Sequence, residues 1–344
     1  MFRDLTITDI RPEGSDAICI TFDTPADMAW KPGQYLTLRS MVGGQDIRRS
    51  YSIASFPDQP LCVGVKQVDG GAFSTFAQSL TQGKTLQVMP PEGRFIPRGE
   101  QSLLLVAAGS GITPMISIAA ETLAHGAAVT LVYGNRNTAS IMFKDALDAL
   151  KDRYVDRFTM IHILSREPQD VELLNGRVTG EKLQRLARAG AIDLDVDGAY
   201  LCGPGAMIDD VSAMMQAGGM PAEKIHHERF YTEGTAARAP RSEAAQNAAE
   251  KGAEVEVLLD GTRRIFMVTQ ADDNVLDAAA RQGLELPYSC KGGMCCTCRC
   301  KVTNGSAEMA VNYSLEPWEL EQGFTLACQT RPTTDKLTLD FDAA

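Results

Sequence analysis

The sequence contains no long uninterrupted hydrophobic run. Its most apolar stretch, residues 103–120, is broken by Gly109-Ser110-Gly111 and by Thr113-Pro114. This pattern suits a buried strand, a turn and a helix better than a membrane span. The N-terminus, Met1-Phe2-Arg3-Asp4, lacks the apolar core of a secretory signal peptide. We therefore expect a cytoplasmic protein that is not held in a membrane.

The chain has fewer basic residues than acidic ones. The chain has 33 Lys and Arg against 44 Asp and Glu, which gives a formal net charge of −11. Such a charge argues against nucleic acid and against an anionic membrane as partners. Histidine is scarce, with four in the chain, and the adjacent pair His226-His227 would point to opposite faces of a strand. We therefore do not expect these two histidines to share a metal ion.

The 344 residues, 44% of them hydrophobic, are enough for two or three domains with separate cores. Residues 1–100 show short strand patterns, many of them separated by Gly or Pro turns, which predicts a small antiparallel β-barrel. The expected strands of this barrel are Leu5–Ile10, Ala17–Phe22, Gln34–Leu38, Tyr51–Ile53 and Leu61–Val68.

Strand and helix patterns alternate over residues 101–232, which predicts a parallel sheet covered by helices. Residues 233–251 are rich in alanine and have no strand pattern, so we expect a linker there. Residues 252–344 begin with a hairpin pattern around Asp260-Gly261, and a helix is expected over 274–282. The predicted fold is thus multidomain, with an antiparallel barrel, a parallel α/β domain and a third, compact domain.

The nine cysteines are unevenly placed, since five of them fall within residues 290–300. Crowding of this kind in a long chain without a secretion signal points to a metal rather than to disulfides. The spacing Cys290-x4-Cys295-x2-Cys298, followed by a distant Cys328, is that of a plant-type [2Fe–2S] cluster. The sequence therefore predicts that these four cysteines are the cluster ligands.

A structural zinc site with four cysteine ligands is the alternative. Such a site prefers two Cys-x2-Cys knuckles, whereas this chain has one knuckle with a four-residue lead-in. Gly292 and Gly293 would let the backbone approach the cluster and turn N–H groups toward its sulfurs. Cys296 and Cys300 do not fit the ligand spacing.

Two short patterns in the barrel have a joint chemical interpretation. Arg49-Ser50-Tyr51-Ser52 supplies an arginine that can pair with phosphate, a ring that can stack on a flavin and a hydroxyl that can bond the flavin edge. The turn Gly71-Ala72-Phe73-Ser74 would offer N–H groups to a pyrophosphate. Each pattern alone is weak, because Arg49 could be a surface charge, Tyr51 ordinary packing and Gly71 an ordinary turn.

Residues 103–114 read as a buried strand, a glycine turn at Gly109 and Gly111, and a helix that begins near Thr113-Pro114. The start of such a helix can meet a pyrophosphate, although the third glycine of the dinucleotide fingerprint is absent. Cys202-Gly203-Pro204 ends another strand at the edge of the sheet where ligands sit. The alternatives are a turn of any α/β protein and a small buried residue at Cys202.

Ser165 and Arg166 directly follow an expected strand, where they can bind the 2′-phosphate of NADPH. NAD-preferring sites commonly place an acidic residue there instead. We therefore favour NADPH, with Arg136 as a second phosphate contact. The alternative is that Arg166 is a surface charge paired with Glu167.

The barrel patterns, in this order and ahead of a parallel-sheet domain, resemble the ferredoxin–NADP reductase superfamily, and residues 252–342 resemble a plant-type ferredoxin of β-grasp fold. The resemblance implies flavin binding, FAD rather than FMN, by Arg49, Tyr51, Ser52, Gly71 and Ser74. It also implies that Cys202, Gly203 and Pro204 lie beside the nicotinamide. Glu228 and Phe230 match the acidic residue and the aromatic that face the flavin in this family. The candidate catalytic residues are then Ser52, Cys202 and Glu228.

The order of the three domains resembles reductase components that feed oxygenases. The resemblance is strongest to ring-epoxidising systems, and it rests on the segments Asn312-Tyr313-Ser314-Leu315-Glu316, Thr325-Leu326-Ala327-Cys328-Gln329 and Met294-Cys295-Cys296-Thr297-Cys298-Arg299. Reductases of Rieske-type and steroid hydroxylases are the alternatives. The resemblance implies that electrons pass from NADPH through FAD to the cluster, and then singly to an oxygenase that docks transiently on the ferredoxin domain. Residues 252–344 carry eight Lys and Arg against fourteen Asp and Glu, so a basic patch is expected on that partner. A redox sensor or a stand-alone flavin reductase is less consistent with this order.

Overall fold

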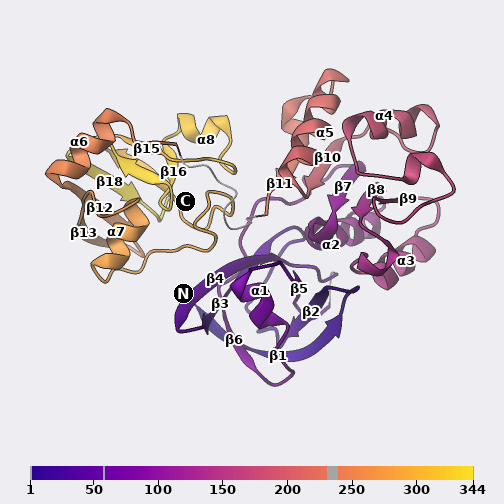
Figure 1. The fold of residues 1–344 in the computed structure, drawn as a ribbon, viewed down its shortest axis with the longest axis horizontal. Coiled ribbons are helices and arrows are strands. Elements are labelled where there is room, and N and C mark those ends of the chain that lie inside the picture. Colours follow the sequence, from indigo (N-terminus) through magenta and orange to yellow (C-terminus); the bar gives the residue numbers. More distant parts are fainter. Residues whose placement is uncertain (1, 57–58, 231–238, 344) are drawn as a thin grey trace. The chain divides into compact units, whose positions relative to one another are not determined.

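The computed structural model describes residues 2–56, 59–230 and 239–343. The chain divides into two compact units, Met1–Phe230 and Tyr231–Ala344 (Figure 1). No helix in the described ranges is long and apolar enough to cross a membrane.

The first unit begins with a six-stranded antiparallel sheet in the order β4-β3-β6-β1-β2-β5. An isolated bridge between Ile53, just past β4, and Val63 of β5 joins the two ends of this sheet, as a barrel requires. Inward-facing residues such as Ile7, Ile20 and Leu36 are fully buried and fill the interior. The predicted antiparallel barrel is confirmed. Its elements are β1 Arg3–Pro12, β2 Ala17–Phe22, β3 Tyr35–Val42, β4 Gln45–Ser52, β5 Cys62–Lys66, α1 Ala72–Ala77 and β6 Thr85–Val88.

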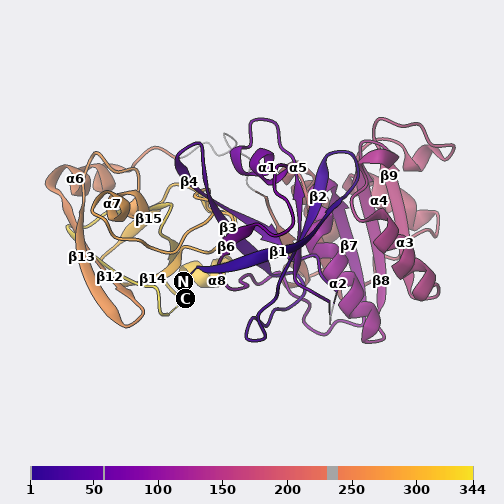
Figure 2. The ribbon, with the colours of Figure 1, turned by 90° about the horizontal axis from the view of Figure 1, so that it is seen from below.

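A parallel sheet of order β11-β10-β7-β8-β9 follows in the same unit. Figure 2 shows β7, β8 and β9 of this sheet side by side. The predicted alternation of strand and helix is confirmed. The elements are β7 Ser102–Ala108, α2 Ile112–Ala124, β8 Ala128–Asn135, α3 Lys144–Arg153, β9 Phe158–Leu164, α4 Gly180–Arg188, β10 Gly198–Cys202, α5 Gly205–Ala217 and β11 Ile225–Glu228.

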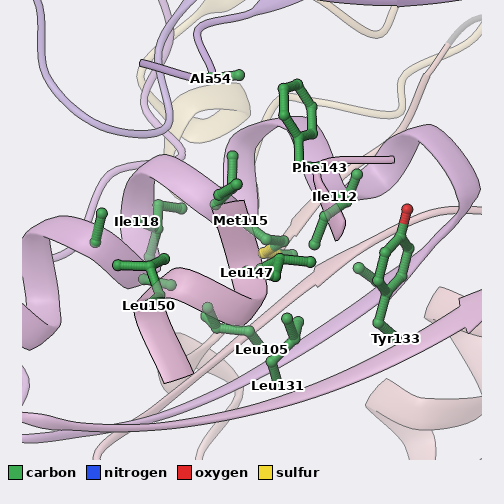
Figure 3. Packing of buried hydrophobic residues seen from close by; sticks show 14 of the residues in the cluster. Ala54, Leu105, Ile112, Met115, Ile118, Leu131, Tyr133, Phe143, Leu147 and Leu150 are labelled. Carbon is green, nitrogen blue, oxygen red and sulfur yellow. The ribbon is translucent and has the colours of Figure 1, made fainter. Parts of the chain in front are cut away.

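Helices cover both faces of this sheet, because alternate strand residues point to opposite sides. On one face, Leu105 and Leu131 pack in a cluster with α2 and α3, which Figure 3 shows from close by. Barrel residues, among them Ala54, belong to the same cluster. On the other face, Leu104 and Val132 pack with α4 and α5. The α2/α3 face of the parallel sheet therefore shares an apolar cluster with part of the barrel, whereas the barrel interior and the α4/α5 face have clusters of their own.

The second unit is a mixed five-stranded sheet of order β13-β12-β18-β14-β16 with α7 packed against it. Its hairpin turn has left-handed backbone at Asp260 (φ 51°) and Gly261 (φ 70°), as predicted from the Asp-Gly pair. Asn274 caps the predicted helix by accepting a hydrogen bond from the Asp277 N–H. The elements are β12 Ala253–Leu259, β13 Thr262–Val268, α7 Val275–Arg281, β14 Arg299–Asn304, β15 Ala307–Met309, α8 Pro317–Glu321, β16 Phe324–Leu326, β17 Thr330–Pro332 and β18 Lys336–Asp340.

The expectation of a linker over residues 233–251 is wrong for the C-terminal half of this range. Residues 233–238 lie outside the described residues, but Glu243–Lys251 form helix α6. Ser242 caps this helix, and Ala248 is buried in the core of the second unit. Alanine has the highest helix propensity, but this is a weak preference, and the burial of Ala248 in the core is what orders the helix here. The expected domain boundaries stay predictions.

Candidate flavin, dinucleotide and cluster sites

Strand β4 places the flavin candidates on two faces. Arg49 and Tyr51 lie on one face because they are two residues apart, and Ser52 lies on the other. The Tyr51 ring lies 5.7 Å from the Phe73 ring of α1 at an angle of 39°, and burial raises the pKa of its hydroxyl. Arg49 donates a hydrogen bond to the carbonyl of Arg48 at 2.8 Å. A ring and a cation on the same face fit a flavin and its phosphate.

The turn before α1 uses the Ser74 side chain internally. Its hydroxyl accepts a hydrogen bond from the Val68 N–H at 3.1 Å and donates one to the Gly71 carbonyl at 3.1 Å. A Cβ on Gly71 would lie 2.6 Å from this hydroxyl oxygen, so the turn requires glycine. Ser74 therefore shapes the turn, and the backbone of the turn is left as the candidate partner of a pyrophosphate.

The three candidate catalytic residues come together although they are far apart in sequence. Ser52 Oγ donates a hydrogen bond to Glu228 Oε2 at 3.2 Å. Glu228 lies beside Cys202 in the parallel register of β11 and β10. Burial, and secondarily the Glu228 charge, raises the pKa of the Cys202 thiol well above its usual range. The site thus combines a hydroxyl, a carboxyl group and a neutral thiol, and Phe230 packs against the adjoining core.

The glycine turn between β7 and α2 is held tightly against the end of β10. A Cβ on Gly111 would lie 2.0 Å from the Cys202 carbonyl oxygen. The Tyr133 hydroxyl donates a hydrogen bond to the Gly109 carbonyl at 3.0 Å, and Thr113 Oγ1 donates one to the Ser110 carbonyl at 2.9 Å. These contacts place the start of α2 at the carboxyl edge of the sheet. A dinucleotide binds at this edge in open α/β folds.

Neighbouring strand ends also hold Gly203, Pro204 and the candidate phosphate-binding residues. Gly203 follows β10, and Pro204 is the N-terminal cap of α5. At the ends of β8 and β9, the Arg166 N–H donates to the Arg136 carbonyl at 2.7 Å, and Ser165 Oγ donates to the Asn135 carbonyl at 3.2 Å. Ser165, Arg166 and Arg136 therefore lie at neighbouring strand ends, and their role in binding a phosphate stays a prediction.

Both guanidinium groups at these strand ends are exposed and have no hydrogen bond or ion pair within residues 2–56, 59–230 and 239–343. The alternative partner of Arg166 is engaged elsewhere, since the Glu167 carboxylate accepts bonds from the Thr138 N–H at 2.8 Å and the Thr138 hydroxyl at 2.6 Å. Two arginines without acidic partners at a strand end fit a phosphate group.

Asn135 is a polar residue of this edge that the sequence interpretation missed. It is 8% exposed at the end of β8, its side-chain amide lies near the Tyr133 hydroxyl, and neither atom of the amide makes a well-formed hydrogen bond in the described part of the chain. Leaving such a group unpaired costs about 1–3 kcal/mol. A bound dinucleotide would supply a polar partner. The only signal in the sequence is an amide directly before Arg136.

The cysteine loop directs N–H groups at sulfur. The Gly292 N–H donates to Cys290 Sγ at 3.3 Å, the Cys290 N–H to Cys295 Sγ at 3.5 Å, and Gln329 Nε2 to Cys328 Sγ at 3.4 Å. Such donors stabilise thiolates and tune the potential of a cluster. The loop depends on left-handed backbone at Lys291, Gly293 and Cys296, with φ of 52°, 75° and 59°.

The donor set fits a two-iron cluster. Cys290, Cys298 and Cys328 are buried and Cys295 is partly exposed, and a [2Fe–2S] cluster takes two thiolates on each iron. Within the described ranges, no three His, Cys, Asp or Glu side chains lie close enough together to hold one metal ion. Cys300 is fully buried in the core of the second unit, and it does not belong to the ligand spacing.

Three protein-family models match the chain. They describe an oxidoreductase FAD-binding domain over residues 4–96, an oxidoreductase NAD-binding domain over 105–213 and a 2Fe-2S iron-sulfur cluster binding domain over 257–333. The three cofactor-binding domains predicted from the sequence are therefore present.

Several curated relatives match over nearly the whole chain. The chain is 44% identical to a component of the 1,2-phenylacetyl-CoA epoxidase of Escherichia coli (strain K12), covering 99% of this chain and 98% of the relative. It is 35% identical to the ferredoxin reductase component of 3-ketosteroid-9-alpha-monooxygenase of Rhodococcus rhodochrous, covering 98% and 96%.

Among solved structures, phthalate dioxygenase reductase superposes with a TM-score of 0.60 at 23% identity, covering 99% of this chain and 98% of that one. At this level of identity, the likeness shows the fold alone. The chain therefore belongs to the ferredoxin–NADP reductase-type oxidoreductases in which an FAD-binding domain, an NAD-binding domain and a [2Fe–2S] ferredoxin domain follow one another.

Proposed function

We propose that this protein is the reductase component of a multicomponent oxygenase, and that its partner is a ring-epoxidising oxygenase that acts on phenylacetyl-CoA. The observation that carries the proposal is the 44% identity over 99% of the chain to a component of phenylacetyl-CoA epoxidase. The relatives named for a 3-ketosteroid monooxygenase are 34–36% identical. A steroid hydroxylase reductase is accordingly the second candidate.

The sites described above supply a route for electrons from NADPH to that partner. When bound, FAD accepts two electrons as a hydride and releases them one at a time, and the [2Fe–2S] cluster carries them singly. Arg49 and Tyr51 would hold the flavin on one face of β4. Ser52, fixed by its bond to Glu228, would present a hydroxyl at the flavin edge. The cysteines of the second unit would hold the cluster.

NADPH is the proposed electron donor because of the charges at the strand ends. Arg136 and Arg166 together offer two cationic groups without acidic partners among the described residues, next to the Ser165 hydroxyl. A 2′-phosphate would neutralise these charges, whereas NADH has only a hydroxyl there. The glycine turn at Gly109 and Gly111 would receive the pyrophosphate.

Reduction of an oxygenase component tests the proposed function. The purified chain and NADPH should reduce the oxygenase component of phenylacetyl-CoA epoxidase and support epoxidation, whereas a 3-ketosteroid monooxygenase should receive electrons poorly. Cys298→Ser should abolish delivery to the oxygenase while flavin reduction by NADPH continues. Delivery that survived in Cys298→Ser would remove the cluster from the route, and a preference for the steroid enzyme would select the second candidate.

A further inference from the structure

Helix α8 of the second unit exposes two large apolar side chains. Trp318 is 45% exposed and Leu320 is 43% exposed. They lie on opposite flanks of the helix, on either side of the buried Glu319, because residues two apart in a helix do not face each other. Within residues 239–343, the other exposed large apolar residues are Ile265 and Met267 on β13. Tryptophan is one of the residues enriched at the energetic centres of protein interfaces.

The two apolar patches lie at opposite edges of the sheet. Strand β13 is one edge and β16 is the other. Helix α8 packs on β16, which ends at Leu326, two residues before Cys328. Since Cys328 is a proposed cluster ligand, the patch on α8 lies at the cluster edge of the unit and the patch on β13 lies at the far edge.

Two further contacts tie α8 to the cysteine loop. Arg299 directly follows Cys298 and forms an ion pair with Glu319 of α8, with Nε to Oε1 at 2.8 Å and Glu319 fully buried. In the segment that leads into α8, the Tyr313 N–H and the Ser314 hydroxyl both donate to the Gly293 carbonyl, at 3.1 and 3.2 Å. A partner seated on α8 would therefore contact a surface that is continuous with the cluster loop.

The exposed ring is held in place before any partner arrives. Pro317 begins the helix, and Glu316 and Glu319 form a reciprocal capping box at its start. Trp318 Nε1 donates a hydrogen bond to Glu316 Oε2 at 2.7 Å. Because the ring and its helix are fixed, binding loses less conformational entropy than it would with a mobile side chain.

The segment that carries α8 is acidic. No Lys or Arg occurs between Lys301 and Arg331, whereas this stretch contains four glutamates. Glu308 lies near Arg331 at 3.7 Å and Glu319 pairs with Arg299, so the exposed Glu316 and Glu321 are the carboxylates at the ends of α8. Lys301 Nζ of the neighbouring β14 lies 5.5 Å from the Phe324 ring of β16.

We propose that Trp318 and Leu320, with Glu316 and Glu321 at the ends of the helix, form the docking surface for the oxygenase component. The proposal rests on the proposed function and names where the partner sits. The complementary surface on the oxygenase is an apolar pocket for the tryptophan ring surrounded by Lys and Arg. The charges speed encounter and the ring supplies most of the affinity, while one electron at a time crosses from the nearby cluster.

The test uses the full-length protein loaded with FAD and cluster, and the oxygenase component of phenylacetyl-CoA epoxidase. Trp318→Ala should raise the Kd for the oxygenase about 10-fold or more, and Trp318→Phe should recover part of this loss. Glu321→Lys should slow association and weaken its dependence on salt. Ile265→Ala is the matched control, because it removes an exposed apolar side chain at the far edge and should leave the Kd unchanged.

Reduction of the cluster by NADPH within each variant is followed in parallel and should be unchanged in Trp318→Ala. The inference is overturned if Trp318→Ala binds like the unaltered protein, or if Ile265→Ala weakens binding equally. It is also overturned if Trp318→Ala slows reduction of its own cluster, since the patch would then face the flavin. A change from dimer to monomer on sedimentation would assign the patch to a second copy instead. If the unaltered protein does not reduce this oxygenase at all, the proposed function is refuted, whatever the result for the docking surface.

Discussion

Replacing Arg166 with alanine removes one of the two guanidinium groups at the ends of β8 and β9. In the free protein this group has no acidic partner among the described residues, so its loss leaves no buried charge behind and the fold should persist. Its proposed role is to bind the 2′-phosphate that distinguishes NADPH from NADH. The variant therefore tests nucleotide choice separately from stability.

The size of the effect follows from the kind of bond that is lost. A hydrogen bond to a charged group contributes about 1.5–3 kcal/mol when shielded from water, and an exposed ion pair contributes roughly 0.2–1 kcal/mol. Arg166 is exposed before the nucleotide binds and is covered by it afterwards, so we expect about 1–2 kcal/mol. This corresponds to a rise of about 5–30-fold in the KM for NADPH. The KM for NADH should be unaffected.

Steady-state reduction of ferricyanide with each nucleotide measures both constants. Arg188→Ala, an exposed arginine near the end of α4 in the same domain, is the control and should change neither KM. In Arg166→Ala, kcat with NADPH should be preserved, because the residue binds a part of the nucleotide remote from the reacting carbon. Equal changes with NADPH and NADH, or no change with either, would refute the assignment of Arg166 to the 2′-phosphate.

Three further substitutions follow from single contacts. Ser52→Ala removes the donor to Glu228 and should slow flavin reduction by NADPH about 10-fold, as for a lost bond of about 1.4 kcal/mol; an unchanged rate in stopped flow would contradict this role. Gly111→Ala places a Cβ against the Cys202 carbonyl and should cost about 1–3 kcal/mol in urea unfolding, so an unshifted midpoint would count against the packing. Burial raises the pKa of Glu13, so the folded protein holds this proton more tightly than the unfolded chain does. The contribution of Glu13 to the free energy of unfolding is therefore lost as the pH rises through the pKa of Glu13 in the folded protein. Glu13→Gln should remove that loss, and parallel stability curves against pH would show the inference to be wrong.

Much of the fold follows from local patterns in the sequence. The Asp260-Gly261 pair fixes a tight hairpin, and the spacing of Cys290, Cys295 and Cys298 reflects a loop that wraps a cluster. Such features depend on neighbours a few residues away. For that reason they can be predicted from the sequence.

Other features depend on distant partners. The hydrogen bond between Ser52 and Glu228 joins the barrel to the last strand of the parallel sheet, and family resemblance alone pointed to these two residues. The unpaired amide of Asn135 is recognisable only once its burial is known. Helix α6 was missed because propensity is a weak signal, and only the packing of Ala248 in the second unit shows why the segment is ordered.

We propose that electrons enter this protein through the flavin and leave it through the cluster. This path can be tested by rapid mixing of the loaded protein with NADPH under anaerobic conditions, with the flavin and cluster absorbance bands followed separately. We expect the flavin band to bleach first and the cluster band to follow, and we expect Cys298→Ser to keep the first phase and lose the second. A cluster that stays oxidised while the flavin turns over, or that is reduced before the flavin, would contradict it.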